Sequence, residues 1–219
     1  MSANHAAFNL IFRFVENYVS PIAGRISSQR HVMAIRDGFI SAMPFMIVGS
    51  FLLVFAYPPF SPDTTWGFAR AWLDMAKQFE GQILTPFDMT MGIMSIYICA
   101  AIAYNLGKHY VKSHQLDPFM CAMLSLMAFL LVAAPKTKGT LPVDSLGGTG
   151  IFTAILVAIY CVEMMRFLKA HNIGIRLPDQ VPPMIKNSFD LLIPVLVVVL
   201  TLYPLSLVIQ SQFGMLIPD

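Results

Sequence analysis

Five long apolar segments, separated by polar stretches, dominate the pattern of this chain. They cover approximately residues 38–57, 89–106, 118–134, 150–168 and 189–209. A helix needs about 20 apolar residues to cross the hydrocarbon core of a bilayer, and a helix satisfies its own backbone groups in lipid. The second and third segments are short, so we expect tilt or flanking turns to complete them. The pattern predicts an all-α integral membrane protein, a bundle of about five transmembrane helices.

The polar stretches predict two further helices outside the bundle. Apolar residues recur at helical spacing from Phe8 to Tyr18, which is typical of an amphipathic helix at the membrane surface. We therefore expect residues 1–36 to form a cytoplasmic amphipathic segment and residues 37–219 to form the membrane domain. Between residues 58 and 88, Trp66 and Trp72 alternate with charges, which favours a helix along the outer surface over a sixth span.

Composition strengthens the membrane interpretation. Hydrophobic residues make up 57% of the 219, charged residues 12%, and the mean hydropathy is +0.68. A soluble domain carries roughly 25% charged residues. The net charge of +2 gives no support to a nucleic-acid partner. Cys99, Cys121 and Cys161 fall in three separate apolar segments without metal-ligand spacing, which predicts buried free thiols.

The distribution of Lys and Arg predicts the orientation. With the N-terminus inside, the cytoplasmic side carries ten basic residues and the outer side four, which agrees with the positive-inside rule. The ten are Arg13, Arg25, Arg30, Arg36, Lys108, Lys112, Arg166, Lys169, Arg176 and Lys186, and the four are Arg70, Lys77, Lys136 and Lys138.

Chemistry-bearing motifs of soluble enzymes are absent from the sequence, so we expect no catalytic residue, no metal site and no cofactor. The five histidines (His5, His31, His109, His114 and His171) lie in the predicted cytoplasmic segments and are interpreted as solvated. Glu163 with Arg166 leaves two interpretations, a carboxylate facing a polar cavity or, as favoured, an ion pair near the cytoplasmic interface. Asp190 is expected at the terminus of the fifth helix. Pro44 and Pro194 predict kinks in the first and fifth helices.

Two loops stand out. Residues 146–150 read Leu-Gly-Gly-Thr-Gly immediately before the fourth apolar segment. Glycines there let the backbone approach a ligand, whose hydroxyl or anion the free N–H groups of the next helix can bind. A tight turn with a helix cap explains the same residues equally well. Residues 175–183 contain three prolines in six positions, which hold the chain extended before the fifth helix.

These segments resemble a known family. The run IRLPDQVPPMIKNSFDLLIP (residues 175–194) is similar to a segment of the sugar permeases of the bacterial phosphotransferase system, in the enzyme IIC family for lactose, cellobiose and chitobiose. HVMAIRDGFISAMPFMIVGS, MGIMSIYICAAIAYNLGK and SLGGTGIFTAILVAIYCVEMMRFL agree in order and spacing. The resemblance covers about His31 to Pro194 and corresponds to the N-terminal half of the family.

The resemblance implies a ten-helix permease in the bacterial plasma membrane that binds a disaccharide and exposes it to the cytoplasm. Its partners would be enzyme IIB, which phosphorylates the sugar, and enzyme IIA, which supplies the phosphate. The first five helices of the family form much of a homodimer contact, and its second half supplies most of the sugar pocket. By match to the motif, Gly147, Gly148 and Thr149 would approach the sugar.

Two functional hypotheses follow. The favoured one is a permease component for uptake of a disaccharide of the cellobiose, chitobiose or lactose type, present as a half-length chain that is either a truncated form or one part of a split transporter with a separate C-terminal half. Phosphoryl transfer itself would belong to the partner subunits. The alternative is a truncated or split membrane dimerisation module with no transport activity of its own.

Overall fold

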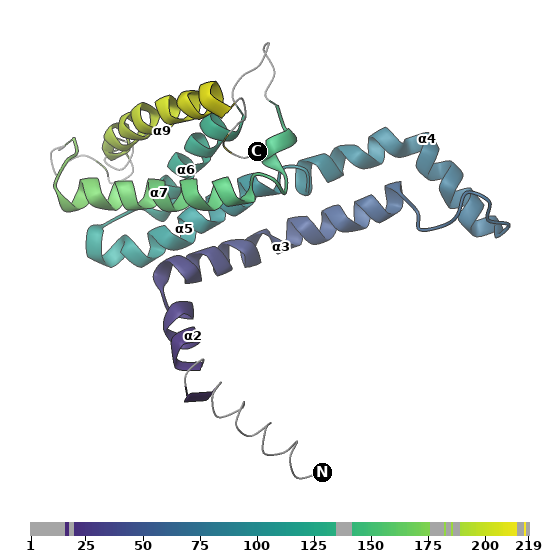
Figure 1. Cartoon of the computed structure of the whole chain (residues 1–219), viewed down its shortest axis with the longest axis horizontal. Helices are drawn as coiled ribbons and strands as arrows, with labels where there is room; N and C mark the ends of the chain where they lie inside the picture. The colour runs from purple at the N-terminus through teal and green to yellow at the C-terminus, as the bar shows by residue number, and fades with distance from the viewer. Residues whose placement is uncertain are drawn as a thin grey trace, which may run out of the picture.

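The structure, a computed structural model, is a bundle of helices (Figure 1). It describes residues 16–17, 20–134, 142–175, 182, 185, 189–213 and 217. In chain order the elements are α2 (Ser20–Ser27), α3 (Arg30–Ala56), α4 (Gly67–Thr90), α5 (Met94–His114), α6 (Pro118–Ala133), the 3₁₀ helix η2 (Asp144–Leu146), α7 (Ile151–Ala170) and α9 (Leu192–Phe213).

The predicted all-α membrane fold is confirmed. Four helical stretches are long and apolar enough to cross a membrane, namely Arg30–Ala56, Gly67–His114, Ile151–Ala170 and Leu192–Gln212. Pro118–Ala133 is a shorter apolar helix. Its start is defined by the carboxylate of Asp117, which accepts hydrogen bonds from the N–H groups of Phe119 and Met120. The five predicted apolar segments therefore correspond to α3, α5, α6, α7 and α9.

The ends of the helices differ from the predicted ends. Helix α3 begins at residue 30 instead of 38, and α5 covers Met94–His114 instead of 89–106. Hydropathy marks only the apolar part of a helix, whereas these two helices continue through polar turns. The expected boundary between residues 36 and 37 consequently lies inside α3. The amphipathic helix predicted from Phe8 to Tyr18 lies outside the described residues, except for positions 16 and 17.

The two predicted proline kinks have different outcomes. Pro44 lies inside α3, as expected. Pro194 is the third residue of α9, in the first turn, where a proline is tolerated because its missing N–H would have no helical partner. The prediction of an internal kink at Pro194 is therefore wrong, and the proline inside α9 is Pro204.

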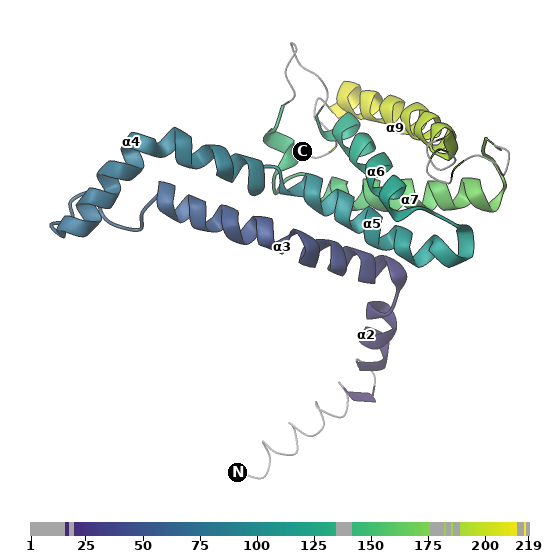
Figure 2. The same ribbon diagram turned by 180° about the vertical axis from the view of Figure 1, so that it is seen from behind.

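The helix predicted between residues 58 and 88 is present as α4. It packs against α3 and runs back along it, and the hairpin of the two helices extends beyond the bundle in both views (Figures 1 and 2). Near the tip, Trp72 Nε1 donates to the carbonyl of Phe55 at 3.2 Å. The hydroxyl of Tyr57 donates to Glu80 at 2.9 Å, and this bond raises the pKa of the phenol. Aromatic side chains with polar groups are typical of a membrane interface.

The core is built around α5, which packs against α3, α6 and α7. In both views α3 and α9 lie on opposite sides of the bundle (Figures 1 and 2). A Cβ atom on Gly38 would stand 2.4 Å from Ile102 Cγ1, so a glycine at this position allows α3 and α5 to approach closely. Cys99, Cys121 and Cys161 are buried and free, as predicted.

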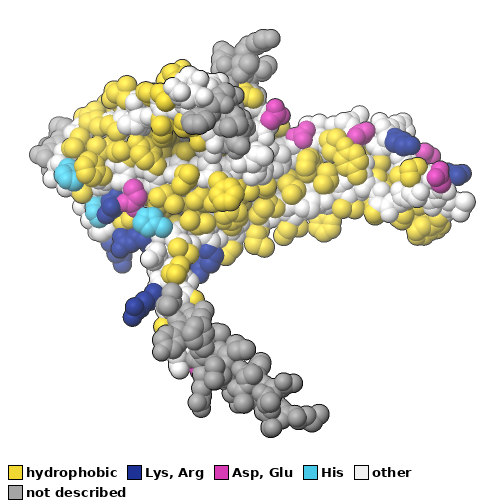
Figure 3. Space-filling model, viewed as in Figure 1, with side chains coloured by type: hydrophobic (Ala, Val, Ile, Leu, Met, Phe, Trp, Pro, Cys, Tyr) yellow, Lys and Arg dark blue, Asp and Glu magenta, His cyan; other side chains and the backbone are white. Residues whose placement is uncertain are grey.

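Large apolar side chains also cover the outside of the bundle. Figure 3 shows hydrophobic side chains along much of one face. Phe51 on α3 is 65% exposed, Phe152 on α7 80% and Leu200 on α9 64%. A soluble protein would have to cover such a surface. Lipid or a further protein chain is therefore the environment that this surface fits.

Candidate functional site

The glycine-rich loop before α7 is packed against the start of α5. The hydroxyl of Ser95 donates to the carbonyl of Leu146. A Cβ on Gly147 would stand 3.0 Å from the carbonyl oxygen of Gly92, and one on Gly150 would stand 2.1 Å from that of Ser145. These glycines are therefore required by close packing of the backbone.

The middle of the same loop is open. Gly148 and Thr149 are exposed, and Thr149 Oγ1 donates to the carbonyl of Asp144 at 3.3 Å. A Cβ on Gly148 would meet only Met94 Cε, at 3.4 Å. The loop is thus held by close packing at Gly147 and Gly150, and the short stretch of backbone between them, just before α7, is exposed.

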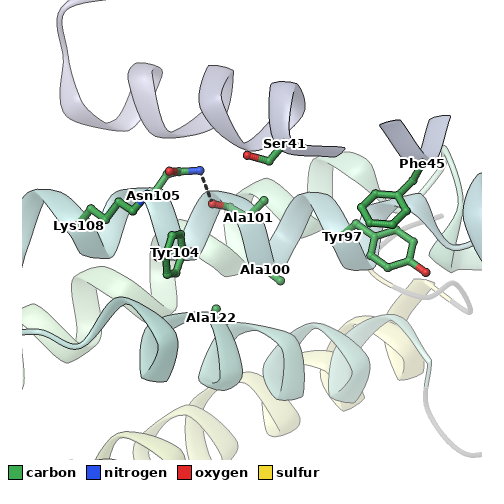
Figure 4. Close-up of a pocket in the computed structure, with 9 residues that line it drawn as sticks. All are labelled: Ser41, Phe45, Tyr97, Ala100, Ala101, Tyr104, Asn105, Lys108 and Ala122. Carbon is green, nitrogen blue, oxygen red and sulfur yellow. Dashed lines mark hydrogen bonds between the residues drawn. The ribbon is translucent and has the colours of Figure 1, made fainter. Parts of the chain in front are cut away.

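A groove of about 380 Å³ lies between α3, α5 and α6 (Figure 4). The rings of Phe45 and Tyr97 stack at one end, with centroids 4.4 Å apart. At the other end Lys108 Nζ stands 4.4 Å from the centre of the Tyr104 ring. Its complete lining is Ser41, Phe45, Tyr97, Ala100, Ala101, Tyr104, Asn105, Lys108 and Ala122.

The floor of this groove is made of small side chains. Ala100, Ala101 and Ala122 line it, and the amide of Asn105 donates to the carbonyl of Ala101 at 2.9 Å. Small residues on a membrane helix let another helix approach closely. The groove could not be predicted from the sequence, because its lining comes from three helices and no single segment carries the pattern.

Polar side chains meet around Glu163, towards the end of α7 that lies opposite the glycine-rich loop. One carboxylate oxygen accepts from His31 Nε2 at 2.9 Å and from the hydroxyl of Tyr110 at 2.5 Å, and the other accepts from Arg166 Nε at 2.6 Å. The expected ion pair of Glu163 with Arg166 is present. The interpretation of all five histidines as solvated side chains is wrong for His31, because α3 begins early enough to bring it to α7.

A second ion pair joins the end of α7 to the residues before α9. Lys169 Nζ donates to Asp190 Oδ2 at 2.5 Å. The sequence placed Asp190 at a helix terminus and did not indicate this partner. Among the described residues, no three His, Cys, Asp or Glu side chains lie close enough together to hold a metal ion.

The chain matches known proteins along most of its length. Residues 36–219 match the family described as the phosphotransferase system, EIIC. The chain is 34% identical over 214 residues to the cellobiose-specific EIIC component of Geobacillus stearothermophilus, covering 90% of this chain and 45% of that protein. It is 33% identical to the lichenan permease IIC component of Bacillus subtilis, covering 93% of this chain and 46% of that one.

A solved structure agrees. The transporter ChbC, the IIC component of an N,N'-diacetylchitobiose-specific phosphotransferase system, superimposes with a TM-score of 0.79 at 33% identity. The match covers 94% of this chain and 49% of that one. The chain therefore belongs to the EIIC family of the phosphotransferase system, whose members are integral membrane proteins, and it spans about half the length of the curated relatives it matches.

Proposed function

We propose that this chain acts as a membrane permease component of a phosphotransferase system that takes up a disaccharide of the cellobiose, chitobiose or lactose type. The observation that carries the proposal is the TM-score of 0.79 with the chitobiose transporter together with 34% identity to a cellobiose component. In this function the chain supplies the N-terminal half of a permease. Enzymes IIB and IIA carry out the phosphoryl transfer, and some relatives are named as fused EIICB components.

The sugar contact that we propose on this chain is the backbone at Gly147, Gly148 and Thr149, of which Gly148 and Thr149 are exposed. A disaccharide presents many hydroxyl groups, each of which needs a hydrogen-bond partner when it leaves water. Exposed N–H groups before α7 are suited to that task. The close packing at Gly147 and Gly150 supports the proposal, because it holds the loop in one conformation.

The orientation that we propose has the N-terminus in the cytoplasm, with residues 1–36 as a cytoplasmic segment and residues 37–219 as the membrane domain. Its support is that the start of α3, the end of α5 and the end of α7 meet around Glu163. This arrangement brings Arg30, Lys112 and Lys169, all assigned to the cytoplasmic side by their charge, to one end of the bundle.

The assembly that we propose is a homodimer. The small side chains of Ala100, Ala101 and Ala122 would let a helix of a second copy approach the groove, and the exposed apolar side chains of α3 would be covered there.

A chimera tests the transport function. This chain replaces the aligned segment of the Geobacillus stearothermophilus cellobiose component, and uptake of labelled cellobiose is measured in cells with the matching IIA and IIB but no other permease. We expect uptake by the chimera and none by the 219 residues alone, since their loop cannot surround a disaccharide. A chimera that inserts into the membrane at normal levels but does not transport would overturn the proposal. Uptake by neither the chimera nor any mixture of halves would favour a dimerisation module.

A further inference from the structure

A second cavity lies at the opposite end of α7 from the glycine-rich loop. It measures about 590 Å³ and is lined by Ser28, Gln29, Arg30, His31, Tyr110 and Arg166. Gly150 and Arg166 are 16 positions apart along α7, which is about 24 Å of helix. The cavity is therefore separate from the proposed sugar contact.

Two guanidinium groups approach one aromatic ring beside this cavity. The Cζ atoms of Arg30 and Arg166 stand 5.2 Å and 5.3 Å from the centre of the Tyr110 ring. Tyr110 is 1% exposed, so its ring holds both groups against a fixed surface. Both arginines therefore lie against the same buried ring, and both line the cavity.

The charges at the cavity do not balance. Glu163 is the acid that bonds to this cluster, and both of its oxygens are already occupied by His31, Tyr110 and Arg166. Across the part of the chain that the structure describes, no carboxylate forms an ion pair with Arg30. At least one positive charge is thus left without a counter-charge, in a cavity large enough for a small molecule.

We propose that this cavity binds the phosphate group of a ligand. A guanidinium presents a planar fork of N–H donors that matches phosphate oxygens, and the charge of Arg30, which no carboxylate balances, attracts an anion. The side chain of Gln29 adds donors at the rim. A neutral sugar would leave the charge of Arg30 unmatched, and a cation would be repelled. The phosphate comes either from a free phosphate compound or from an anionic lipid headgroup.

The experiment measures binding to the purified chain at constant ionic strength in two arms. One arm titrates inorganic phosphate against a chloride blank by calorimetry. The other titrates micelles containing phosphatidylglycerol against micelles containing phosphatidylcholine. Arg30→Gln removes the unpaired charge. Arg36→Gln is the matched control, because Arg36 lies on the same helix and is exposed and paired with its neighbour Asp37.

We expect saturable binding in at least one arm. Arg30→Gln should weaken the affinity about tenfold, which corresponds to the loss of one charged hydrogen bond. Arg36→Gln should change the affinity by less than about twofold. Arg30→Lys keeps the positive charge but lacks the planar guanidinium, so its affinity should lie between those of the wild type and Arg30→Gln. Binding of phosphate alone identifies a free ligand, and binding of phosphatidylglycerol, with or without phosphate, identifies a headgroup. No saturable binding in either arm, or equal losses in Arg30→Gln and Arg36→Gln, would overturn the proposal.

Discussion

Tyr110 on α5 and Glu163 on α7 are joined by a hydrogen bond of 2.5 Å between the phenol and a carboxylate oxygen. The same oxygen accepts from His31 of α3, so the pair ties three helices together at one end of the bundle. Side-chain bonds between membrane helices stabilise a bundle that has little hydrophobic driving force for association in lipid. The cluster is therefore predicted to contribute to stability independently of any ligand.

Tyr110→Phe should destabilise the protein by about 1–2 kcal/mol, because it removes one buried donor from a charged acceptor. Denaturant titration in detergent measures the change. Tyr104→Phe is the matched control, since Tyr104 lies on the same helix, is 40% exposed, and its hydroxyl makes no hydrogen bond within the described residues. Equal stability of the two variants would contradict the role assigned to this bond.

Gly150→Ala should be poorly tolerated, whereas Gly148→Ala should be nearly neutral. The new methyl group at position 150 would stand 2.1 Å from the carbonyl oxygen of Ser145, while at position 148 it meets only the flexible end of Met94 at 3.4 Å. We expect a loss of about 1–3 kcal/mol or more for the first variant and less than about 0.5 kcal/mol for the second. Thermal unfolding of both variants in the same detergent checks the difference.

Hydropathy predicted the five apolar helices because lipid imposes one requirement on every spanning segment. It did not predict where α3 begins, since a helix continues through polar turns after the apolar run has ended. The contact of His31 with Glu163 joins residues 132 positions apart. No local pattern encodes such a contact.

The glycine-rich loop shows the same limit at the candidate site. The sequence placed it correctly before α7 and left two explanations open, a turn or a ligand contact. The structure adds two neighbours, Gly92 in the turn between α4 and α5 and Ser95 on α5, which explain Gly147 and Gly150 by packing. Gly148 has no such explanation, so the ligand hypothesis now rests on that residue and Thr149.

Gly148→Leu is predicted to weaken sugar binding without unfolding the protein. The leucine side chain would occupy the exposed space beside the backbone of Thr149, and the loss of one or two hydrogen bonds corresponds to about a tenfold weaker affinity. The measurement is cellobiose binding to the chimera described above. His114→Ala serves as the control, because His114 is half-buried at the far end of α5 and should leave the affinity unchanged. An unchanged affinity in Gly148→Leu would remove this loop from the site.

Cysteine labelling should place Lys112→Cys on the cytoplasmic side and Asp63→Cys on the outer side. Both positions are exposed, and they lie at opposite ends of the structure, in the last turn of α5 and between α3 and α4. Background labelling should be low because Cys99, Cys121 and Cys161 are buried. A membrane-impermeant maleimide added to intact cells should modify only residue 63. Modification of both residues from the same side would refute the five-span arrangement.

Ala101→Trp should dissociate the proposed homodimer. The indole would fill the groove that is lined by Ala100, Ala101 and Ala122, and a second helix could then no longer approach it. The wild-type chain should run as a dimer in mild detergent, and the variant as a monomer, by light scattering corrected for bound detergent. Leu156→Trp is the control, because Leu156 is 67% exposed on α7, outside the groove. A wild-type monomer would refute the dimer, and dissociation by Leu156→Trp alone would move the contact from the groove to α7.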